Sequence, residues 1–169
     1  MREYVSDLQD NNFFVPFVAL VETWLCPEVD DAQINITGFN VFRQDRRMKK
    51  HGGVLLYVNK KIVIDSFELF DDGQCCAIIC LSKLSKCFIS CIYRPPNSTL
   101  PSFDSMLTFI SNFVTLHNPI NKFHLHLFGD FNLPGFCWEK TQVDNSFSQN
   151  PLHNKLTQFM TTHFLSQYV

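Results

Sequence analysis

The 169-residue sequence has few of the features that mark membrane, secreted or repeat proteins. The apolar run from Phe13 to Val21 is too short to cross a bilayer and lacks the basic start of a signal peptide. No internal repeat or low-complexity linker divides the chain, and its 46% apolar content is enough for a core. We therefore expect one soluble, intracellular domain over residues 1–169, either nuclear or cytoplasmic.

Strong net charge and paired cysteines are also missing. The formal net charge of -2 gives no overall attraction for nucleic acid, so a polyanion would need a local basic patch or bound cations. The cysteines form an odd set without CxxC pairs, and several lie in apolar, strand-like runs. We expect free thiols in a reducing compartment rather than disulfides or zinc ligands. The cysteines are Cys26, Cys75, Cys76, Cys80, Cys87, Cys91 and Cys137.

Short apolar or alternating runs, bounded by glycine, proline, asparagine or charged residues, predict a series of strands. Apolar residues between Ser102 and His117 recur at spacings of three and four, which predicts an amphipathic helix opened by Ser102. A second helix is predicted over Leu152–Phe164. Many strands before the first long helix favour a layered α/β sandwich over a regular βαβ alternation. The predicted strands are Phe13–Val21, Val54–Val58, Ile62–Leu69, Cys75–Leu81, Phe88–Tyr93 and Phe123–Phe128.

One predicted strand ends on a carboxylate and a carboxamide. The run breaks at Gly129 and is followed by Asp130 and Asn132. Because side chains alternate along an extended chain, we expect Asp130 and Asn132 on the same side. Asp130 can then coordinate a metal or activate a nucleophile, and Asn132 can stabilise charge on a transferring phosphoryl group. The alternative interpretation of this segment is a simple Asx turn.

Two other strand ends carry polar groups. Glu22 ends an apolar run, where an unpaired buried carboxylate would be costly; the alternative is a surface or salt-bridged glutamate. Tyr93 can donate to a phosphate oxygen, Arg94 can pair with phosphate, and Asn97 can hydrogen-bond a substrate backbone. The alternative for this second segment is a rigid exit turn built on its two prolines.

A glycine pair and a basic run precede another strand. Gly52 and Gly53 let the chain turn tightly into the strand that begins at Val54. The basic run can contact phosphates, although a solvated loop is the simpler interpretation. Carboxylates and neutral oxygens, without clustered histidine or cysteine pairs, favour Mg²⁺ or Mn²⁺ over zinc. The basic run consists of Arg43, Arg46, Arg47, Lys49, Lys50 and His51.

Four of these motifs occur in an order that resembles the endonuclease/exonuclease/phosphatase superfamily, with the apurinic-type endonuclease domain of non-LTR retrotransposons as the nearest variant. The resemblance runs over nearly the whole chain. It implies a DNase-I-like α/β sandwich of two sheets with flanking helices, a divalent metal, and hydrolysis of phosphodiester bonds in DNA. The motifs are Glu22-Thr23-Trp24-Leu25, Gly52-Gly53-Val54, Tyr93-Arg94-Pro95-Pro96-Asn97 and Gly129-Asp130-Phe131-Asn132.

The resemblance also implies roles for single residues. Glu22 matches the metal-binding glutamate of the family, and Tyr93 matches its active-site tyrosine. Asp130 matches the aspartate that orients or deprotonates the attacking water, while Asn132 matches the asparagine that contacts the scissile phosphate. The implied catalytic group therefore joins three of the strand ends described above.

The same resemblance makes Arg94 and Asn97 candidate substrate contacts, but parts of the family pattern are absent. The sequence has neither the early strand bearing an asparagine near the metal nor the late aspartate and Ser-Asp-His motif. None of the six histidines is expected to replace the missing one, since His126 lies about 13 Å along the strand from Asp130. We expect an incomplete domain with weak or absent turnover and an exposed sheet edge that favours a partner or aggregation.

Three other interpretations remain open. The chain is an inactive module that binds phosphate or nucleic acid, a remnant of a retroelement, or a phosphatase of the same superfamily acting on sugar or lipid phosphates. The motif variants that begin at Glu22 and Tyr93 favour the retroelement endonuclease over the phosphatase. A plasmid-nicking assay with Mg²⁺ separates hydrolysis from binding alone.

Overall fold

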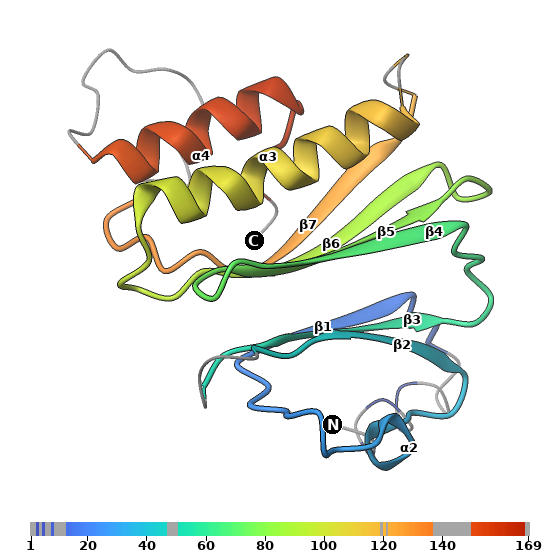
Figure 1. Cartoon of the computed structure of the whole chain (residues 1–169). Helices are drawn as coiled ribbons and strands as arrows, with labels where there is room; N and C mark the ends of the chain where they lie inside the picture. Colours follow the sequence, from blue (N-terminus) through green and yellow to red (C-terminus); the bar gives the residue numbers. More distant parts are fainter. Residues whose placement is uncertain are drawn as a thin grey trace.

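The computed structural model describes residues 13–46, 51–118, 120, 122–136 and 150–167, together with residues 3, 5 and 8. Its elements are β1 (Phe17–Val21), α2 (Asp31–Ile34), β2 (Phe39–Gln44), β3 (Val54–Asn59), β4 (Ser66–Asp71), β5 (Cys76–Ser82), β6 (Cys87–Tyr93), α3 (Leu100–His117), β7 (His124–Asp130) and α4 (Pro151–Thr162). Two sheets lie face to face, with α3 and α4 over the outer face of one and α2 beyond the other (Figure 1). The predicted two-sheet α/β sandwich with flanking helices is confirmed.

The strand order of the first sheet is β1-β3-β2, and that of the second is β4-β5-β6-β7. All neighbouring strands are antiparallel except β6 and β7, which are parallel and are connected through α3. A parallel pair needs such a crossover because a tight turn cannot return the chain to the same starting end. Within the described residues, β1 and β7 each have a neighbouring strand on one side only.

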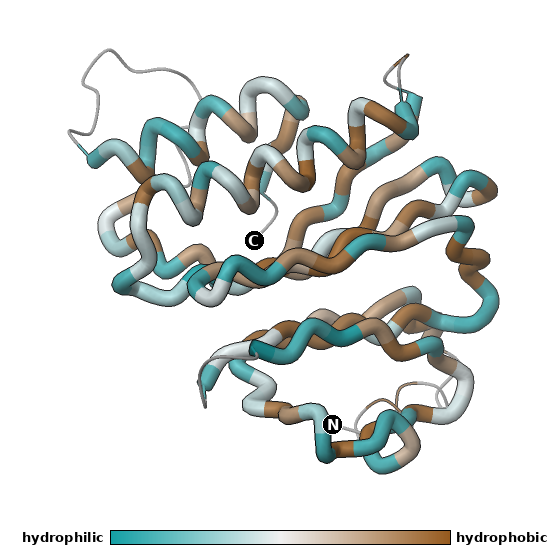
Figure 2. The backbone as a smooth tube through the Cα atoms, in the orientation of Figure 1, coloured by the Kyte–Doolittle hydropathy of each residue, from teal (hydrophilic) through white to brown (hydrophobic). Residues whose placement is uncertain are grey.

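Two buried clusters flank the second sheet, one between the sheets and a larger one under α3 and α4. Every residue of β3 and β5 is buried, as expected for inner strands with both faces covered. Alternate residues of β3, β5 and β6, such as Leu56, Ile78 and Cys91, form one cluster between the sheets, and Tyr93 belongs to it. The opposite face of the second sheet packs on α3 and α4. Figure 2 shows the same division, with hydrophobic colour along the inner strands and hydrophilic colour at the turns.

The two long helices begin with side-chain caps. Thr99 precedes α3, and its hydroxyl accepts a hydrogen bond from the Ser102 N–H at 3.3 Å. The predicted start at Ser102 was therefore late, because Thr99 caps the helix and Pro101 fits its first turn without needing an N–H partner. Asn150 caps α4 in the same way, accepting from the Leu152 N–H at 3.0 Å.

The strand bounds differ from the predictions where pairing decides them. Phe13 and Phe14 are 64% and 57% exposed and precede β1, because the pairing with β3 begins at Phe17. Strand β4 likewise begins at Ser66, which pairs with Leu81, rather than at Ile62. Strand β2 was not predicted, because its Phe-Asn-Val-Phe-Arg-Gln sequence runs into the basic segment and its pairing with β3 is a tertiary contact.

The cysteines of the described residues are free, as predicted. Four are buried, Cys87 is half-buried and Cys26 is exposed, whereas Cys137 lies outside the described residues. Among the described residues, no helix has the length and apolar character needed to cross a membrane. The buried thiols are Cys75, Cys76, Cys80 and Cys91.

Candidate active site

Three strand ends meet at one end of the sandwich. In the first sheet Val21 pairs with Val54, so the next residue of the chain, Glu22, reaches the start of β3. In the second sheet the parallel register pairs Tyr93 with Asp130. Tyr93 points into the space between the sheets, where its hydroxyl faces and interacts with the Glu22 carboxylate. The tyrosine thus connects the glutamate of one sheet with the aspartate of the other.

The Glu22 carboxylate lies at the surface but has several donors around it. Its Oε2 accepts from the Trp24 indole Nε1 at 2.7 Å and from the Gly52 N–H at 2.9 Å. Burial opposes the charged form, yet the hydrogen bonds from Tyr93, Trp24 and Gly52 and the nearby Arg46 cation hold the pKa of Glu22 below its usual 4.5. Glu22 is therefore ionised at neutral pH and is neither a plain surface glutamate nor a partner in a simple salt bridge.

Tyr93 is buried, and its environment keeps it protonated. Burial raises the pKa of its phenol well above the usual 10.0, and the hydrogen bond to the Glu22 carboxylate raises it further. The Arg46 guanidinium acts in the opposite direction and lies 5.7 Å from the ring centroid. At neutral pH Tyr93 is consequently a hydrogen-bond donor rather than a phenolate.

The Asp130–Asn132 segment is a turn, not extended chain. The Asn132 N–H donates to Asp130 Oδ1 and its Nδ2 donates to Asp130 Oδ2, both at 2.8 Å. Strand β7 ends at Asp130, and Asn132 has a left-handed φ of 47°. The prediction that strand alternation would place Asp130 and Asn132 on the same side is therefore wrong in its reason, because the chain is not extended there. The two side chains do lie together. The Asx turn weighed as an alternative is the device that joins them.

Arg94 lies inside the protein below this turn. Arg94 is only 1% exposed. Its Nη1 donates to the carbonyl oxygens of Phe131 at 3.1 Å and Asn132 at 2.8 Å. The Asn132 Nδ2 in turn donates to the Arg94 carbonyl at 2.8 Å. In this structure Arg94 holds the turn from beneath instead of facing solvent, whereas Asn97 is exposed after β6.

The residues of the basic run, predicted as a phosphate contact or a solvated loop, have different partners in the structure. Arg43 is bound to Asp31 at 3.2 Å and Asp45 at 3.1 Å, so it joins β2 to the α2 region. Arg46 is 8% exposed and donates to the His51 carbonyl at 3.0 Å and the Gly73 carbonyl at 3.3 Å. Neither of these arginines belongs to a solvated loop. Arg47, Lys49 and Lys50 lie outside the described residues.

Sequence reasoning did not give Trp24, Arg46 or His51 a place in the site. The Trp24 ring meets the His51 ring edge-on, with centroids 4.5 Å apart, beside the Glu22 carboxylate. Trp24 belongs to the motif that begins at Glu22, so this motif could have indicated a place for Trp24 in the site. Arg46 and His51 belong to the basic run, but their contacts with Tyr93 and Trp24 are tertiary and have no signal in the local sequence.

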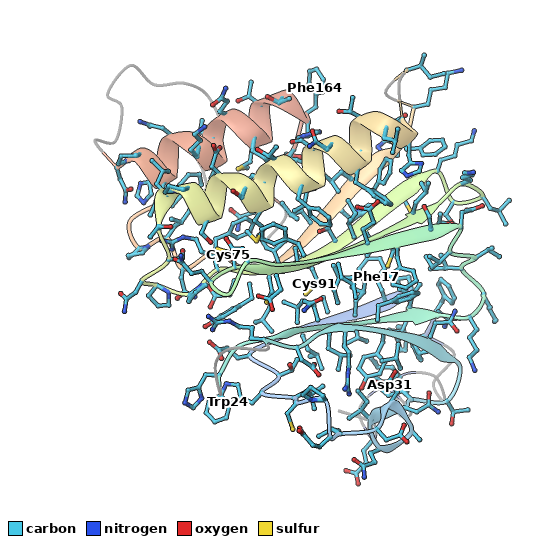
Figure 3. All side chains as sticks on the ribbon, in the orientation of Figure 1. Phe17, Trp24, Asp31, Cys75, Cys91 and Phe164 are labelled. Atoms are coloured by element: carbon cyan, nitrogen blue, oxygen red, sulfur yellow. The ribbon has the colours of Figure 1, made fainter. Side chains whose placement is uncertain are left out.

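Backbone strain gathers at the same place. Glu22, Trp24 and Asn132 have φ values of 53°, 53° and 47°, in the left-handed region that residues other than glycine seldom adopt. Such conformations cost on the order of 1–3 kcal/mol each and are concentrated at functional sites. Figure 3 shows Trp24 projecting from the end of the first sheet, away from the body of the molecule.

Glu22 is the side chain at this site that could bind a metal ion. Within the described residues, no group of three or more histidine, cysteine, aspartate or glutamate side chains is arranged to hold a metal ion. Mg²⁺ needs less from a protein, since it keeps several waters and is bound through one or two carboxylates together with substrate phosphates. The ionised, accessible carboxylate of Glu22 meets this requirement.

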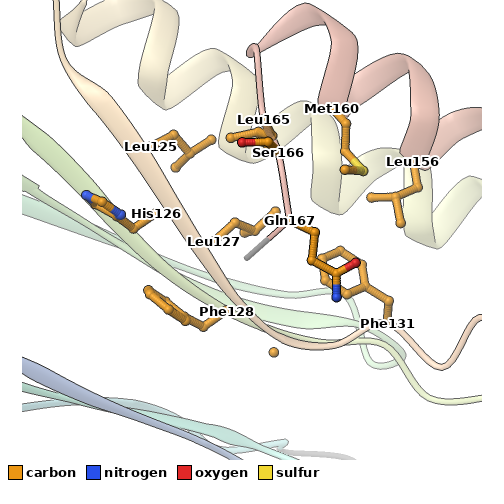
Figure 4. A pocket seen from close by; sticks show the side chains of 11 residues that line it. Leu125, His126, Leu127, Phe128, Phe131, Leu156, Met160, Leu165, Ser166 and Gln167 are labelled. Atoms are coloured by element: carbon orange, nitrogen blue, oxygen red, sulfur yellow. The ribbon is translucent and has the colours of Figure 1, made fainter. Parts of the chain in front are cut away.

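A separate pocket lies between β7 and α4 (Figure 4). It has a volume of about 390 Å³ and is lined by apolar side chains that include Leu127, Leu156 and Met160, with Gln167 at one side. Among the described residues no carboxylate lines it, so they offer no ligand of the kind that a hard metal ion prefers, although His126 is at its edge. The strand ends near Glu22 remain the better candidate for chemistry.

The sequence matches no protein-family model and no curated protein. Three solved structures are similar in fold. The catalytic domain of human Nocturnin, with bound sulfate, aligns with a TM-score of 0.55 and 11% identity over 83% of this chain and 60% of that one. The endonuclease domain of TRAS1, a telomere-specific non-LTR retrotransposon, aligns with a TM-score of 0.54 and 12% identity over 98% of this chain and 67% of that one.

The third structure is D. rerio TDP2 complexed with a single-stranded DNA product, with a TM-score of 0.50 and 14% identity over 78% of this chain and 53% of that one. The chain thus spans between about half and two thirds of the length of these structures. At such low identity the likeness concerns the arrangement of the backbone. It shows that the chain has the two-sheet sandwich fold of these structures, which are members of the endonuclease/exonuclease/phosphatase superfamily.

Proposed function

We propose that this chain is the core of a Mg²⁺-dependent endonuclease domain of the non-LTR retroelement type, hydrolysing phosphodiester bonds in DNA. The observation that carries the proposal is the meeting of Glu22, Tyr93 and Asp130 from three strands at one end of the sandwich. Among proteins of similar fold, the TRAS1 domain is an endonuclease and the TDP2 structure holds a single-stranded DNA product.

Each of these residues has a separate role in the proposed hydrolysis. Asp130 accepts a proton from the attacking water, whose oxygen forms the new bond to phosphorus as the bond to the leaving oxygen breaks. Asn132 contacts the phosphate when one of its two amide N–H groups turns to it from the Arg94 carbonyl. The protonated Tyr93 uses its one O–H to hold the Glu22 carboxylate beside this position. Glu22 would hold the metal ion, which would supply positive charge beside the phosphoryl oxygens.

Two further residues have different roles in this proposal. Arg94 acts as a positioning residue, because its guanidinium binds the backbone of the turn that carries Asp130 and Asn132. Asn97 is exposed and stays a candidate contact to the substrate backbone.

A nicking assay on supercoiled plasmid tests the proposal. We expect slow conversion to open circles with Mg²⁺ or Mn²⁺ and none with a chelator. Glu22→Gln and Asp130→Asn should each lower the rate by at least about 100-fold, the scale expected for loss of a catalytic acid–base or metal-binding group. Asp104→Asn is the matched control, because this carboxylate pairs with Lys155 on the helical layer.

Three outcomes would count against the proposal. Equal nicking by the wild type and by Glu22→Gln would point to a contaminating nuclease. Salt-dependent DNA binding without any nicking would leave the inactive binding module as the function. Release of phosphate from a monoester, with no attack on a diester, would favour the phosphatase interpretation.

A further inference from the structure

Resting on the proposed function, we infer that the Trp24 indole is a stacking platform for an unpaired nucleobase next to the phosphate that is cut. The substrate class would then be DNA with a single-stranded or displaced nucleotide at the cleavage position. Three features of Trp24 support this role: its ring is exposed, the ring is held in one orientation, and its indole nitrogen is hydrogen-bonded to Glu22.

The Trp24 ring is exposed yet held in place. The residue is 61% exposed, although tryptophan carries a large apolar surface. Its Nε1 donates to Glu22 Oε2 at 2.7 Å, its backbone N–H donates to the Gly52 carbonyl at 2.9 Å, and its ring meets that of His51 at 4.5 Å. Three contacts therefore fix the indole plane while leaving much of its surface accessible to solvent.

This arrangement costs conformational energy. Trp24 has a φ of 53°, which for a bulky residue is a genuine outlier. Single exposed aromatic residues are common and need no explanation, but a strained, hydrogen-bonded and solvent-facing tryptophan is a different case. Phe164 shows that exposure and strain do not by themselves mark a site, since it is 86% exposed with a φ of 52° and lies beyond α4 on the opposite side of the molecule (Figure 3). What sets Trp24 apart is the hydrogen bond from its indole to Glu22.

The position of the ring selects a nucleobase as its partner. The indole nitrogen touches the carboxylate that holds the metal in the proposed reaction, so a phosphate bound there would have its neighbouring nucleotide close to the ring. Every nucleobase has a flat π-face that stacks on exposed aromatic side chains. In duplex DNA these faces are covered by adjacent bases, which is why the nucleotide has to be unpaired.

Binding of fluorescent oligonucleotides tests the inference. An Asp130→Asn background prevents cleavage, and the probes are a single-stranded oligothymidine and the same backbone with every base removed. Trp24→Ala should weaken binding of the oligothymidine by between about 5-fold and about 100-fold, the range for one lost stacking contact. It should leave binding of the abasic strand unchanged, and Phe164→Ala should affect neither probe.

Trp24→Phe separates stacking from the hydrogen bond to Glu22. Phenylalanine keeps an aromatic face but lacks the N–H, so it should bind oligothymidine within about threefold of the parent protein. In a Trp138→Phe variant, which leaves Trp24 as the one tryptophan, oligothymidine should also quench the indole emission.

Equal effects of Trp24→Ala on base-bearing and abasic strands would overturn the inference. So would a Trp24→Phe variant as weak as Trp24→Ala, because the hydrogen bond to Glu22 would then be the part that matters. The proposed hydrolysis fails by a different measurement, namely absent nicking by the wild-type protein. The two failures are therefore distinguishable.

Discussion

Tyr93 shows how a single side chain in this protein serves packing and chemistry together. Its ring belongs to the cluster between the sheets, while its hydroxyl reaches the Glu22 carboxylate. The parallel register places its backbone next to Asp130. A tyrosine suits this position because one end is apolar and the other is a hydrogen-bond donor. The site is thus an extension of the core and inherits its rigidity.

Arg94 provides a test of positioning by a buried charge. Arg94→Met removes the donors to the Phe131 and Asn132 carbonyls and should lower the free energy of unfolding by about 3 kcal/mol or more. Lys155→Met is the control, because the Lys155–Asp104 pair is well exposed and should contribute less than about 1 kcal/mol. Urea denaturation measures both. A loss for Arg94→Met no larger than that for Lys155→Met would contradict the positioning role.

Among the secondary-structure elements, β6 and β7 depend most on one another. Their backbones approach closely where Gly129 pairs with Ile92, and a Cβ at Gly129 would lie 2.0 Å from the Ile92 carbonyl oxygen. The glycine also has a φ of 140°, which disfavours other residues. This approach aligns Tyr93 with Asp130 one position later, so the spacing of the two strands sets the geometry of the site.

Gly129→Ala should therefore damage both stability and activity. The new methyl group must push β7 away from β6, at an expected loss of about 3 kcal/mol or more in the free energy of unfolding. Gly73→Ala is the matched control, since its φ of 83° is also left-handed but nothing lies within 4 Å of the new Cβ. It should cost only about 1–2 kcal/mol. Similar unfolding midpoints for the two variants would show that β7 accommodates the methyl group freely.

For the molecule as a whole, the buried layer between the two sheets is what joins them. It holds three thiols, Cys76, Cys80 and Cys91, and burial raises the pKa of each to about 12. These groups stay protonated at any pH at which the protein functions. They behave as small apolar side chains rather than as nucleophiles or metal ligands.

Alkylation with iodoacetamide at pH 8 reports on this layer. In a Cys137→Ser variant, we expect the exposed Cys26 to be modified in the native protein. The three thiols between the sheets should react at least about a thousandfold more slowly than unfolded cysteine, because both access and thiolate fraction are small. Denaturation in guanidinium should equalise the rates, as read by peptide mass spectrometry. Rapid native modification of Cys80 would mean that the sheets separate readily.

Much of the architecture was predictable from local pattern. The apolar runs of β3, β5 and β6 and the three-and-four spacing of α3 are properties of short segments, so periodicity identified them. The ordered motifs around Glu22, Tyr93 and Asp130 pointed to the superfamily whose fold the chain has. Element bounds were less predictable, because pairing with a distant strand decides where β1 and β4 begin.

The amino-acid order alone predicted which residues are proposed for metal, proton-transfer and phosphate chemistry, since such a prediction depends on side-chain type and motif. Tertiary structure decided which of them meet. The register of β6 on β7 brings Tyr93 to Asp130, and the packing of the two sheets brings Glu22 to Tyr93. A slip of one residue between β6 and β7 would turn a side chain to the opposite face. The same packing buried Arg94 and exposed Trp24, because burial depends on neighbours that are distant in the sequence.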